Sequence, residues 1–153
     1  MTQQRRICVR GIIFKDGKLF AQRLKNKQTG KVNEFLCTPG GGLDPGEGLH
    51  AGLHREMIEE TGIAPQIGRL LLTQQFMDGD TEMLEFFFHI ENADDYENIN
   101  LADTTHGEIE IEHFGFVDPK SENVLPKLLQ TMDLNEYTTT VQPVVVMDNF
   151  NEA

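Results

Sequence analysis

Three glutamates, Glu56, Glu59 and Glu60, are spaced so that one helix would carry all of them on a single face. At about 100° per residue, Glu60 lies roughly 40° and Glu59 roughly 60° from Glu56 around the helix axis. Carboxylates this close repel one another unless a cation neutralises them, and their hard oxygens suit Mg²⁺ or Mn²⁺ better than zinc or copper. The spacing therefore predicts a divalent metal site, with a solvated acidic helix face as the simpler alternative.

The three glutamates fall within residues 41–63, which begin with glycines and continue as a predicted helix. Apolar residues at intervals of four predict the buried face of this helix: Leu49, Leu53 and Met57. The glutamates are therefore expected on its exposed face, and Gly62 is placed to end it as a left-handed cap residue. A second acid, Glu47, lies in a separate turn after the glycines, which makes a merely solvated acidic helix the weaker interpretation.

The same stretch resembles the Nudix box: Gly, five residues, Glu, seven residues, Arg-Glu, aliphatic, any residue, Glu-Glu, any residue, Gly, aliphatic. Every specified position is filled without insertion or deletion, by Gly41, Glu47, Arg55, Glu56, Met57, Glu59, Glu60, Gly62 and Ile63. The resemblance implies an α/β fold, a Nudix-type α/β/α sandwich with a mixed sheet and a central catalytic helix. A length of 153 residues fits a single Nudix hydrolase domain over residues 1–153.

The resemblance assigns the metal and the support of its site to different residues. The implied ligands of Mg²⁺ or Mn²⁺ are Glu56, Glu59, Glu60 and the carbonyl group of Gly40. Arg55 is expected to support the site instead, because its planar guanidinium can grip Glu47 and hold the loop that begins at Gly41 against the helix.

The general base is left open among several carboxylates. Within the helix the candidates are Glu59 and Glu56, and the resemblance implies that some relatives supply the base from a distant loop or strand. The best remote candidate is Glu108, with Glu110 and Glu112 on the same face of the same predicted strand. An acidic strand that faces solvent explains this alternation equally well.

A diphosphate bond is the chemistry that such a site suits, because its cleavage needs a water nucleophile, neutralised phosphate oxygens and a stabilised leaving group. The expected activity is a Nudix pyrophosphohydrolase acting on a nucleoside triphosphate, a nucleotide sugar or a similar nucleoside diphosphate derivative. Residues 78–81 contain neither the proline nor the tyrosine that mark ADP-ribose and dinucleoside polyphosphate hydrolases of the family. The alternative is a non-catalytic Nudix-fold nucleotide-binding or regulatory protein, although such proteins usually lose box glutamates that this chain keeps. A calcium-binding module lacks the EF-hand spacing.

Charge is distributed unevenly along the chain. Of the 13 Lys and Arg residues, nine fall within residues 1–31 against a single acid, whereas the whole chain has a net charge of −12. The acidic total argues against direct nucleic-acid binding, and the basic segment suggests a surface that captures a small polyanionic substrate. The predicted substrate contacts are Arg23, Lys25 and Lys27, with a solubilising hairpin edge as the alternative.

No apolar run approaches the roughly 20 residues that a helix needs to cross a membrane, and the first residues lack the apolar core of a secretion signal. A cytoplasmic location is the resulting expectation. Cys8 and Cys37 lie in apolar, strand-like stretches and are expected to be buried free thiols. A homodimer is an option that the sequence leaves open.

The elements that must position these residues follow from the alternation of apolar side chains. Strands are expected over residues 6–14, 19–23, 35–38, 67–77, 82–91 and 108–117, with loops over 24–34 and 92–107. Asp16-Gly17 predicts a tight hairpin turn between the first two strands. A second helix is expected from Ser121 through Met132, with Pro126 in its first turns. The apolar residues 141–150 have no assigned role.

Overall fold

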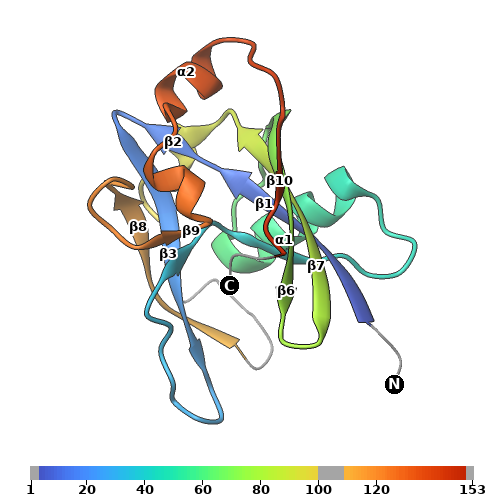
Figure 1. Cartoon of the computed structure of the whole chain (residues 1–153). Helices are drawn as coiled ribbons and strands as arrows, with labels where there is room; N and C mark the ends of the chain where they lie inside the picture. The colour runs from blue at the N-terminus through green and yellow to red at the C-terminus, as the bar shows by residue number, and fades with distance from the viewer. Residues whose placement is uncertain (1–3, 100–108, 151–153) are drawn as a thin grey trace.

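The computed structural model describes residues 4–99 and 109–150, which form a mixed α/β fold with two β-sheets (Figure 1). Sheet A has the order β10-β6-β7-β1-β5, and its strands are Gln4–Ile12 (β1), Gly40–Gly42 (β5), Ile67–Asp78 (β6), Thr81–Ile90 (β7) and Val145–Asp148 (β10). Sheet B has the order β2-β3-β4-β9, with β8 paired to β3, and its strands are Phe14–Lys15 (β2), Lys18–Asn26 (β3), Leu36–Cys37 (β4), Ile109–Val117 (β8) and Val124–Leu125 (β9). The helices are Leu49–Thr61 (α1) and Leu134–Thr139 (α2), with 3₁₀ turns at Ala93–Tyr96 (η1) and Lys127–Gln130 (η3).

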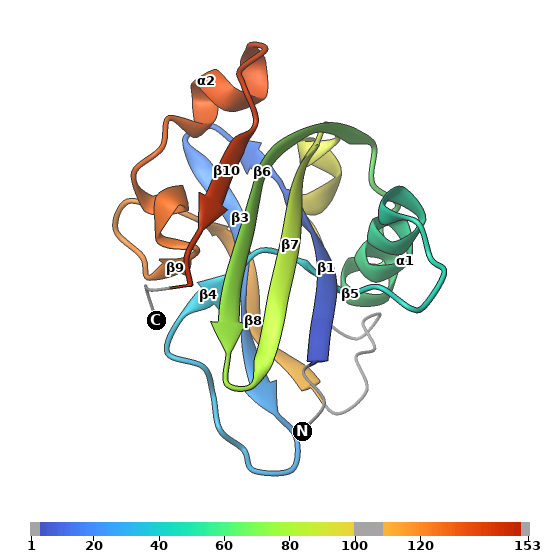
Figure 2. The same ribbon diagram turned by 45° about the vertical axis from the view of Figure 1, so that its right-hand side comes forward.

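Sheet A is a mixed sheet covered on both faces. Strand β1 runs parallel to β7 and antiparallel to β5, and β6 forms an antiparallel hairpin with β7. Figure 2 shows α1 on one side of this sheet and the segment from β9 to α2 on the other. The predicted α/β fold with a mixed sheet is therefore confirmed.

Each face of sheet A has its own hydrophobic core. On one face Leu53 and Met57 of α1 are fully buried against Val9 of β1 and Ile90 of β7. On the other face the core includes Ile12, Leu72 and Phe87 of sheet A with Leu129 and Leu134 of the C-terminal segment. Helix α1 ends at Gly62, which adopts the predicted left-handed conformation with φ of 77°.

The hairpin predicted at Asp16-Gly17 is present, since both residues have positive φ and Lys15 pairs with Lys18 across the turn. Strand β3 continues to Asn26, three residues beyond the predicted end, because β8 pairs with it along most of its length. The free thiols predicted at Cys8 and Cys37 are buried, as expected.

The helix predicted over residues 121–132 is wrong. Val124 and Leu125 instead form strand β9, which pairs in parallel with β4, and the 3₁₀ turn η3 follows Pro126. A proline disfavours helical backbone at the residue before it, so Leu125 remains extended. In the short turn that follows, Leu129 is buried and Leu128 is partly buried. The second helix, α2, begins later, where Asp133 caps it by accepting a hydrogen bond from the backbone N–H of Glu136.

The apolar residues 141–150 now have a place, because β10 pairs in parallel with β6 and forms one edge of sheet A. Residues 100–108 of the predicted loop and strand, Glu108 among them, lie outside the described residues. Across the described ranges, no helix is long and apolar enough to span a membrane.

Candidate active site

Strand β5 is a run of three glycines that pairs with β1 and contacts α1. Gly40 has φ of 139°, and a Cβ atom there would lie 2.0 Å from the carbonyl oxygen of Val9, so only glycine fits. A Cβ atom on Gly41 would lie 2.7 Å from Oε2 of Glu56, which shows that the carboxylate occupies the space that a side chain would take. The glycines thus allow the acidic side of α1 to approach the backbone of β5.

Glu60 is docked onto this backbone. Its Oε2 accepts a hydrogen bond of 2.6 Å from the N–H of Gly40, and its Oε1 accepts one of 3.2 Å from Nε2 of Gln22 on β3. Burial raises the pKa of Glu60 to about 8, although the Gly40 hydrogen bond acts in the opposite direction. Glu60 therefore connects α1 to both sheets.

The expectation that all three glutamates lie on an exposed helix face is wrong for two of them. Glu56 is 6% and Glu60 1% exposed, whereas the side chain of Glu59 is 41% exposed. The buried face of α1 includes Glu56 and Glu60 as well as the apolar residues. The reason is that the glycine strand β5 has no side chains and so leaves room for carboxylates against its backbone.

Arg55 holds Glu47 in the arrangement that its planar guanidinium favours. Its Nε and Nη2 atoms donate to the two carboxylate oxygens of Glu47, each at 2.8 Å, and Nη2 also donates to the carbonyl of Gly42 at 3.2 Å. The pairing lowers the pKa of Glu47 to about 2 and raises that of Arg55. The glycine strand, the following turn and α1 are thereby fastened at one point.

The third nitrogen of Arg55, Nη1, is shared by two acids of α1. It lies 3.1 Å from Oε1 of Glu56 and 3.1 Å from Oε2 of Glu59. Arg55 thus supplies the positive charge that the sequence led us to expect from a metal ion alone. Within residues 4–99 and 109–150, no three His, Cys, Asp or Glu side chains are arranged so that together they could hold a metal ion.

The donor atoms of this site are of the type that a hard divalent cation prefers, although in this arrangement Nη1 of Arg55 bridges Glu56 and Glu59. Carboxylate oxygens of Glu56 and Glu59 already converge on one cationic nitrogen, and oxygen ligands of this kind suit Mg²⁺ or Mn²⁺. Within the part of the chain that the structure describes, two further buried oxygens, Oε1 of Gln22 and Oγ1 of Thr38, have no hydrogen-bond partner. These two oxygens add unpaired polar atoms to the surroundings of α1 and β5.

The predicted substrate contacts lie on β3 and the turn that follows it. Arg23 adjoins Gln22, but its Nη1 donates to the carbonyl of Asn33 at 2.7 Å, which ties β3 to the next loop. Lys25 lies 3.9 Å from the exposed carboxylate of Glu112, and Lys27 is exposed. The contacts of Arg23 and Lys25 are with the loop and with β8 rather than with the acids of α1.

The remote candidates for the general base lie in the strand predicted over residues 108–117. Glu108 lies outside the described residues, as does the side chain of Glu110. Glu112 is exposed and is the acid that faces Lys25.

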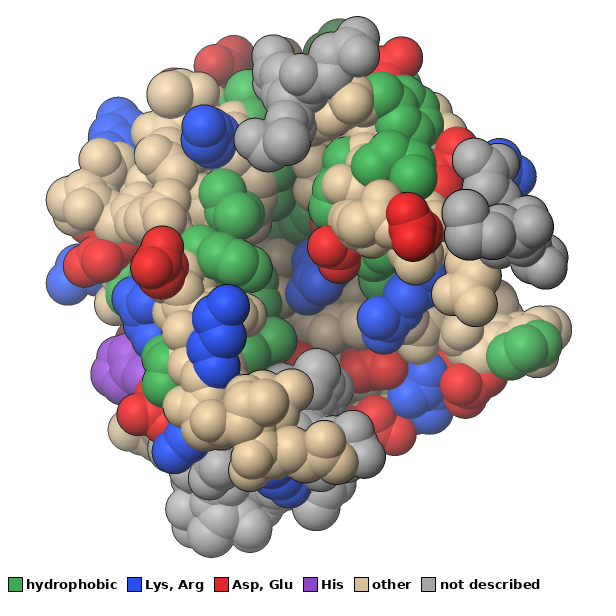
Figure 3. Space-filling model, turned by 60° about the horizontal axis from the view of Figure 1, so that its bottom comes forward, with side chains coloured by type: hydrophobic (Ala, Val, Ile, Leu, Met, Phe, Trp, Pro, Cys, Tyr) green, Lys and Arg blue, Asp and Glu red, His purple; other side chains and the backbone are tan. Residues whose placement is uncertain are grey.

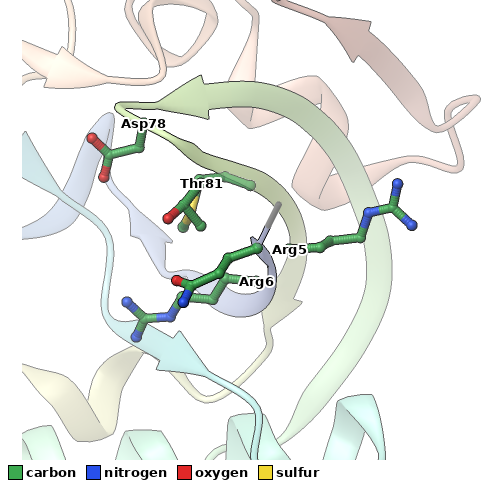
Figure 4. A pocket seen from close by; sticks show the side chains of 6 residues that line it. Arg5, Arg6, Asp78 and Thr81 are labelled. Carbon is green, nitrogen blue, oxygen red and sulfur yellow. The ribbon is translucent and has the colours of Figure 1, made fainter. Parts of the chain in front are cut away.

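Sequence reasoning missed a second arginine near the glycine strand. A Cβ atom on Gly42 would lie 2.7 Å from Nε of Arg6, so the guanidinium covers that glycine. Arg6 also lines a pocket of about 460 Å³ with Asp78, Thr81 and Met83, and Figure 4 shows that Arg5 points the opposite way. Figure 3 shows a hollowed face on which basic and acidic side chains gather around the depression. The alternation of the first strand, which puts Arg6 and Arg10 on one face, was the signal available in the sequence.

Comparison with known proteins points to one family. A family model described as the NUDIX domain matches residues 4–132. No curated protein sequence matches the chain.

Solved structures with similar folds share little sequence with the chain. A UDP-X diphosphatase is 19% identical with a TM-score of 0.66, covering 95% of this chain and 68% of its own. A MutT protein from Methanosarcina mazei Go1 is 19% identical with a TM-score of 0.62, covering 84% and 91% respectively. An ADP-ribose pyrophosphatase from Streptococcus suis 89-1591 is 13% identical with a TM-score of 0.57, covering 92% and 98%. These structures support the fold, and the family model covers most of the chain, which therefore belongs to the Nudix family of hydrolases.

Proposed function

We propose that this protein hydrolyses a diphosphate bond in a nucleoside diphosphate derivative, such as a nucleoside triphosphate or a nucleotide sugar, with Mg²⁺ or Mn²⁺ as its cofactor. The observation that carries the proposal is the convergence of Glu56 and Glu59 on one cationic nitrogen beside the glycine strand. Two proteins of similar fold are named for the cleavage of UDP-X and of ADP-ribose, which supports the same general class of substrate.

The metal would be held by Glu56, Glu59, Glu60 and the carbonyl of Gly40. When bound, a divalent ion neutralises phosphate oxygens and lowers the pKa of a water ligand. The protein contributes the fixed positions of the carboxylates, because Gly40 and Gln22 hold Glu60 while Arg55 holds the other two acids.

We assign the general base to Glu59, with Glu56 and Glu108 as the alternative candidates. Glu59 is the most exposed of the three acids of α1, so a water molecule can reach it to give up a proton. Glu56 is buried against Gly41 and is better placed as a ligand.

The substrate would approach from β3, where Arg23, Lys25 and Lys27 provide positive charge on an otherwise acidic protein. Gln22 on the same strand reaches Glu60, so the backbone that carries Arg23 passes directly beside the acidic site. We infer that Arg23 binds the substrate and that the two lysines act mainly by long-range attraction.

Release of mononucleotide products, separated by chromatography, from a panel of nucleoside triphosphates, nucleotide sugars and dinucleotides, with and without Mg²⁺ or Mn²⁺, tests this function. Glu59→Gln serves as the matched control, because it removes one charge and keeps the shape of the side chain. Metal-dependent release by the natural protein, lost in the control, is the expected result. If nucleotides bind but none is cleaved with either metal, the protein is a non-catalytic nucleotide-binding member of the family.

A further inference from the structure

A continuous line of polar side chains crosses sheet A from its C-terminal edge to the glycine strand. Beside β10, Nδ2 of Asn149 donates to Oε1 of Gln74 on β6 at 3.1 Å, and Nε2 of Gln74 donates to Oε1 of Glu85 on β7 at 2.7 Å. On β1, Nε of Arg10 donates to Oε2 of Glu85 at 2.7 Å, and its Nη1 donates to the carbonyl of Thr38 at 3.0 Å. The line follows the strand order β10-β6-β7-β1 and ends on the residues that lead into β5.

Most of this polar row, defined as Asn149, Gln74, Glu85 and Arg10, is buried. Gln74 is 7% and Glu85 4% exposed, and the side chain of Arg10 is 19% exposed. Burial of an ion pair carries a desolvation cost that well-packed apolar residues would avoid, so such a pair is weak evidence for stability. Both oxygens of Glu85 are occupied, one by Gln74 and one by Arg10, which orients the guanidinium along the row. The other hydrogen bond of Arg10, to the carbonyl of Thr38, suggests that the guanidinium acts on the segment that leads into β5.

The segment that Arg10 holds is the one that presents Gly40 to Glu60. Thr38 is fully buried and accepts from Arg10, Pro39 accepts from the backbone N–H of Gly11 at 2.9 Å, and Gly40 donates to Glu60 at 2.6 Å. Two consecutive residues are thus fastened to β1 and the third to α1. Since Gly40 leaves no space even for a Cβ atom, the segment has little freedom to repack if Thr38 is released.

We propose that Arg10 is a positioning residue of the active site, aligned by Glu85, Gln74 and Asn149, which fixes the backbone of Thr38–Gly40 on which Glu60 docks. The proposal rests on the proposed function, because the role that it assigns to the polar row is to order Glu60, a proposed ligand of the metal. It also means that the C-terminal segment, through Asn149, supports the site from the opposite edge of the sheet.

Amide hydrogen exchange at Gly40, measured by NMR without metal or substrate, tests the positioning directly. The variants are Glu85→Gln, Arg10→Lys and Asn149→Ala, and the control is Glu82→Gln, which breaks the ion pair with Arg5 across the same two strands but outside the row. We expect Glu85→Gln and Arg10→Lys to speed exchange at Gly40 and to weaken Mn²⁺ binding or kcat by about 10-fold or more, the range typical of residues that orient metal ligands. KM for the substrate should stay within about twofold, because no member of the row is assigned to substrate binding.

If Arg10→Lys or Glu85→Gln does not fold, Asn149→Ala still tests the proposal. Asn149 is only half-buried and is the last residue of the polar row, so its replacement should disturb the fold least. Loss of its single neutral hydrogen bond should speed Gly40 exchange by about threefold, with the control unchanged. Exchange at Gly40 that is the same in every folded row variant as in Glu82→Gln overturns the positioning role. Failure of the natural protein to cleave any nucleotide would instead overturn the proposed function, and the exchange result would still decide whether the row orders Gly40.

Discussion

The acidic side chains of α1 and the basic side chains of β3 differ in how closely neighbouring groups fix them. On α1, Arg55 lies within 3.2 Å of carboxylate oxygens of Glu47, Glu56 and Glu59, and its Nη2 also donates to the backbone carbonyl of Gly42. On β3, Lys25 is 3.9 Å from an exposed acid, and Lys27 projects from the following turn. Charge on α1 therefore acts through fixed geometry, and charge on β3 acts through a field that salt weakens.

The comparison is tested most strongly by removing the metal or its ligands. Excess chelator should abolish hydrolysis, and Glu59→Gln and Glu60→Gln should each lower kcat by about 100-fold or more, because they remove a base or a ligand. Release of mononucleotide products gives the rates, and circular dichroism checks that the fold survives. Full turnover in excess chelator would contradict a metal-dependent reaction.

The next largest effect is expected from breaking the paired hydrogen bonds between Arg55 and Glu47. Each of Arg55→Ala and Glu47→Ala should lower kcat/KM by about 10-fold, with Arg55→Ala the more damaging because Arg55 also contacts Glu56 and Glu59. In a double-mutant cycle the combined loss should be smaller than the product of the two single losses, since both changes break one interaction. Strictly independent losses would mean that Arg55 acts without Glu47.

Arg23 tests whether β3 also has a short-range role. Arg23→Ala should raise KM by about fivefold with little change in kcat, the pattern expected when binding to substrate and transition state is lost equally. Because Arg23 also donates to the backbone carbonyl of Asn33, the control is Asn33→Gly, which keeps that carbonyl and loosens only the backbone of the loop. Unchanged KM and kcat for the best substrate would limit β3 to the long-range role.

The smallest effect is expected from the lysines. Lys25→Gln and Lys27→Gln together should lower kcat/KM by about twofold at low ionic strength and leave it unchanged at about 0.5 M salt, where exposed charges are screened. The distant Lys120→Gln and Lys127→Gln pair controls for net charge. An equal loss at all salt concentrations would point to direct contact with the substrate instead.

The sequence was sufficient for the elements of the site that depend on local spacing. Leu53, Met57 and Gly62 predicted the buried face and the end of α1, and the strand predictions over residues 67–77 and 82–91 agree closely with β6 and β7. The box pattern also correctly indicated that Arg55 could reach Glu47, eight residues away on the chain. These features depend on helix geometry and strand alternation, which a sequence displays directly.

Features set by long-range register could not be predicted in the same way. Arg10 and Glu85 meet because β1 and β7 are parallel neighbours, although 75 residues separate them in the chain. The burial of Glu60 depends likewise on how closely α1 approaches β5. The wrong helix over residues 121–132 has a related cause, since the apolar residues there are buried by a strand and a 3₁₀ turn whose partners lie far back in the sequence.

The parallel pairing of β1 with β7 has a consequence for the order of folding. Hairpin β6–β7 joins neighbouring segments, whereas β1 must find a partner more than 70 residues away, a contact with a high entropic cost of closure. During synthesis, β1, β5 and α1 leave the ribosome before β7 exists, so the first 60 residues carry the acidic residues of the site without the sheet that supports them. We therefore expect the site to be among the last parts of the molecule to become ordered, because β1, to which the glycine strand is paired, is itself held by β7.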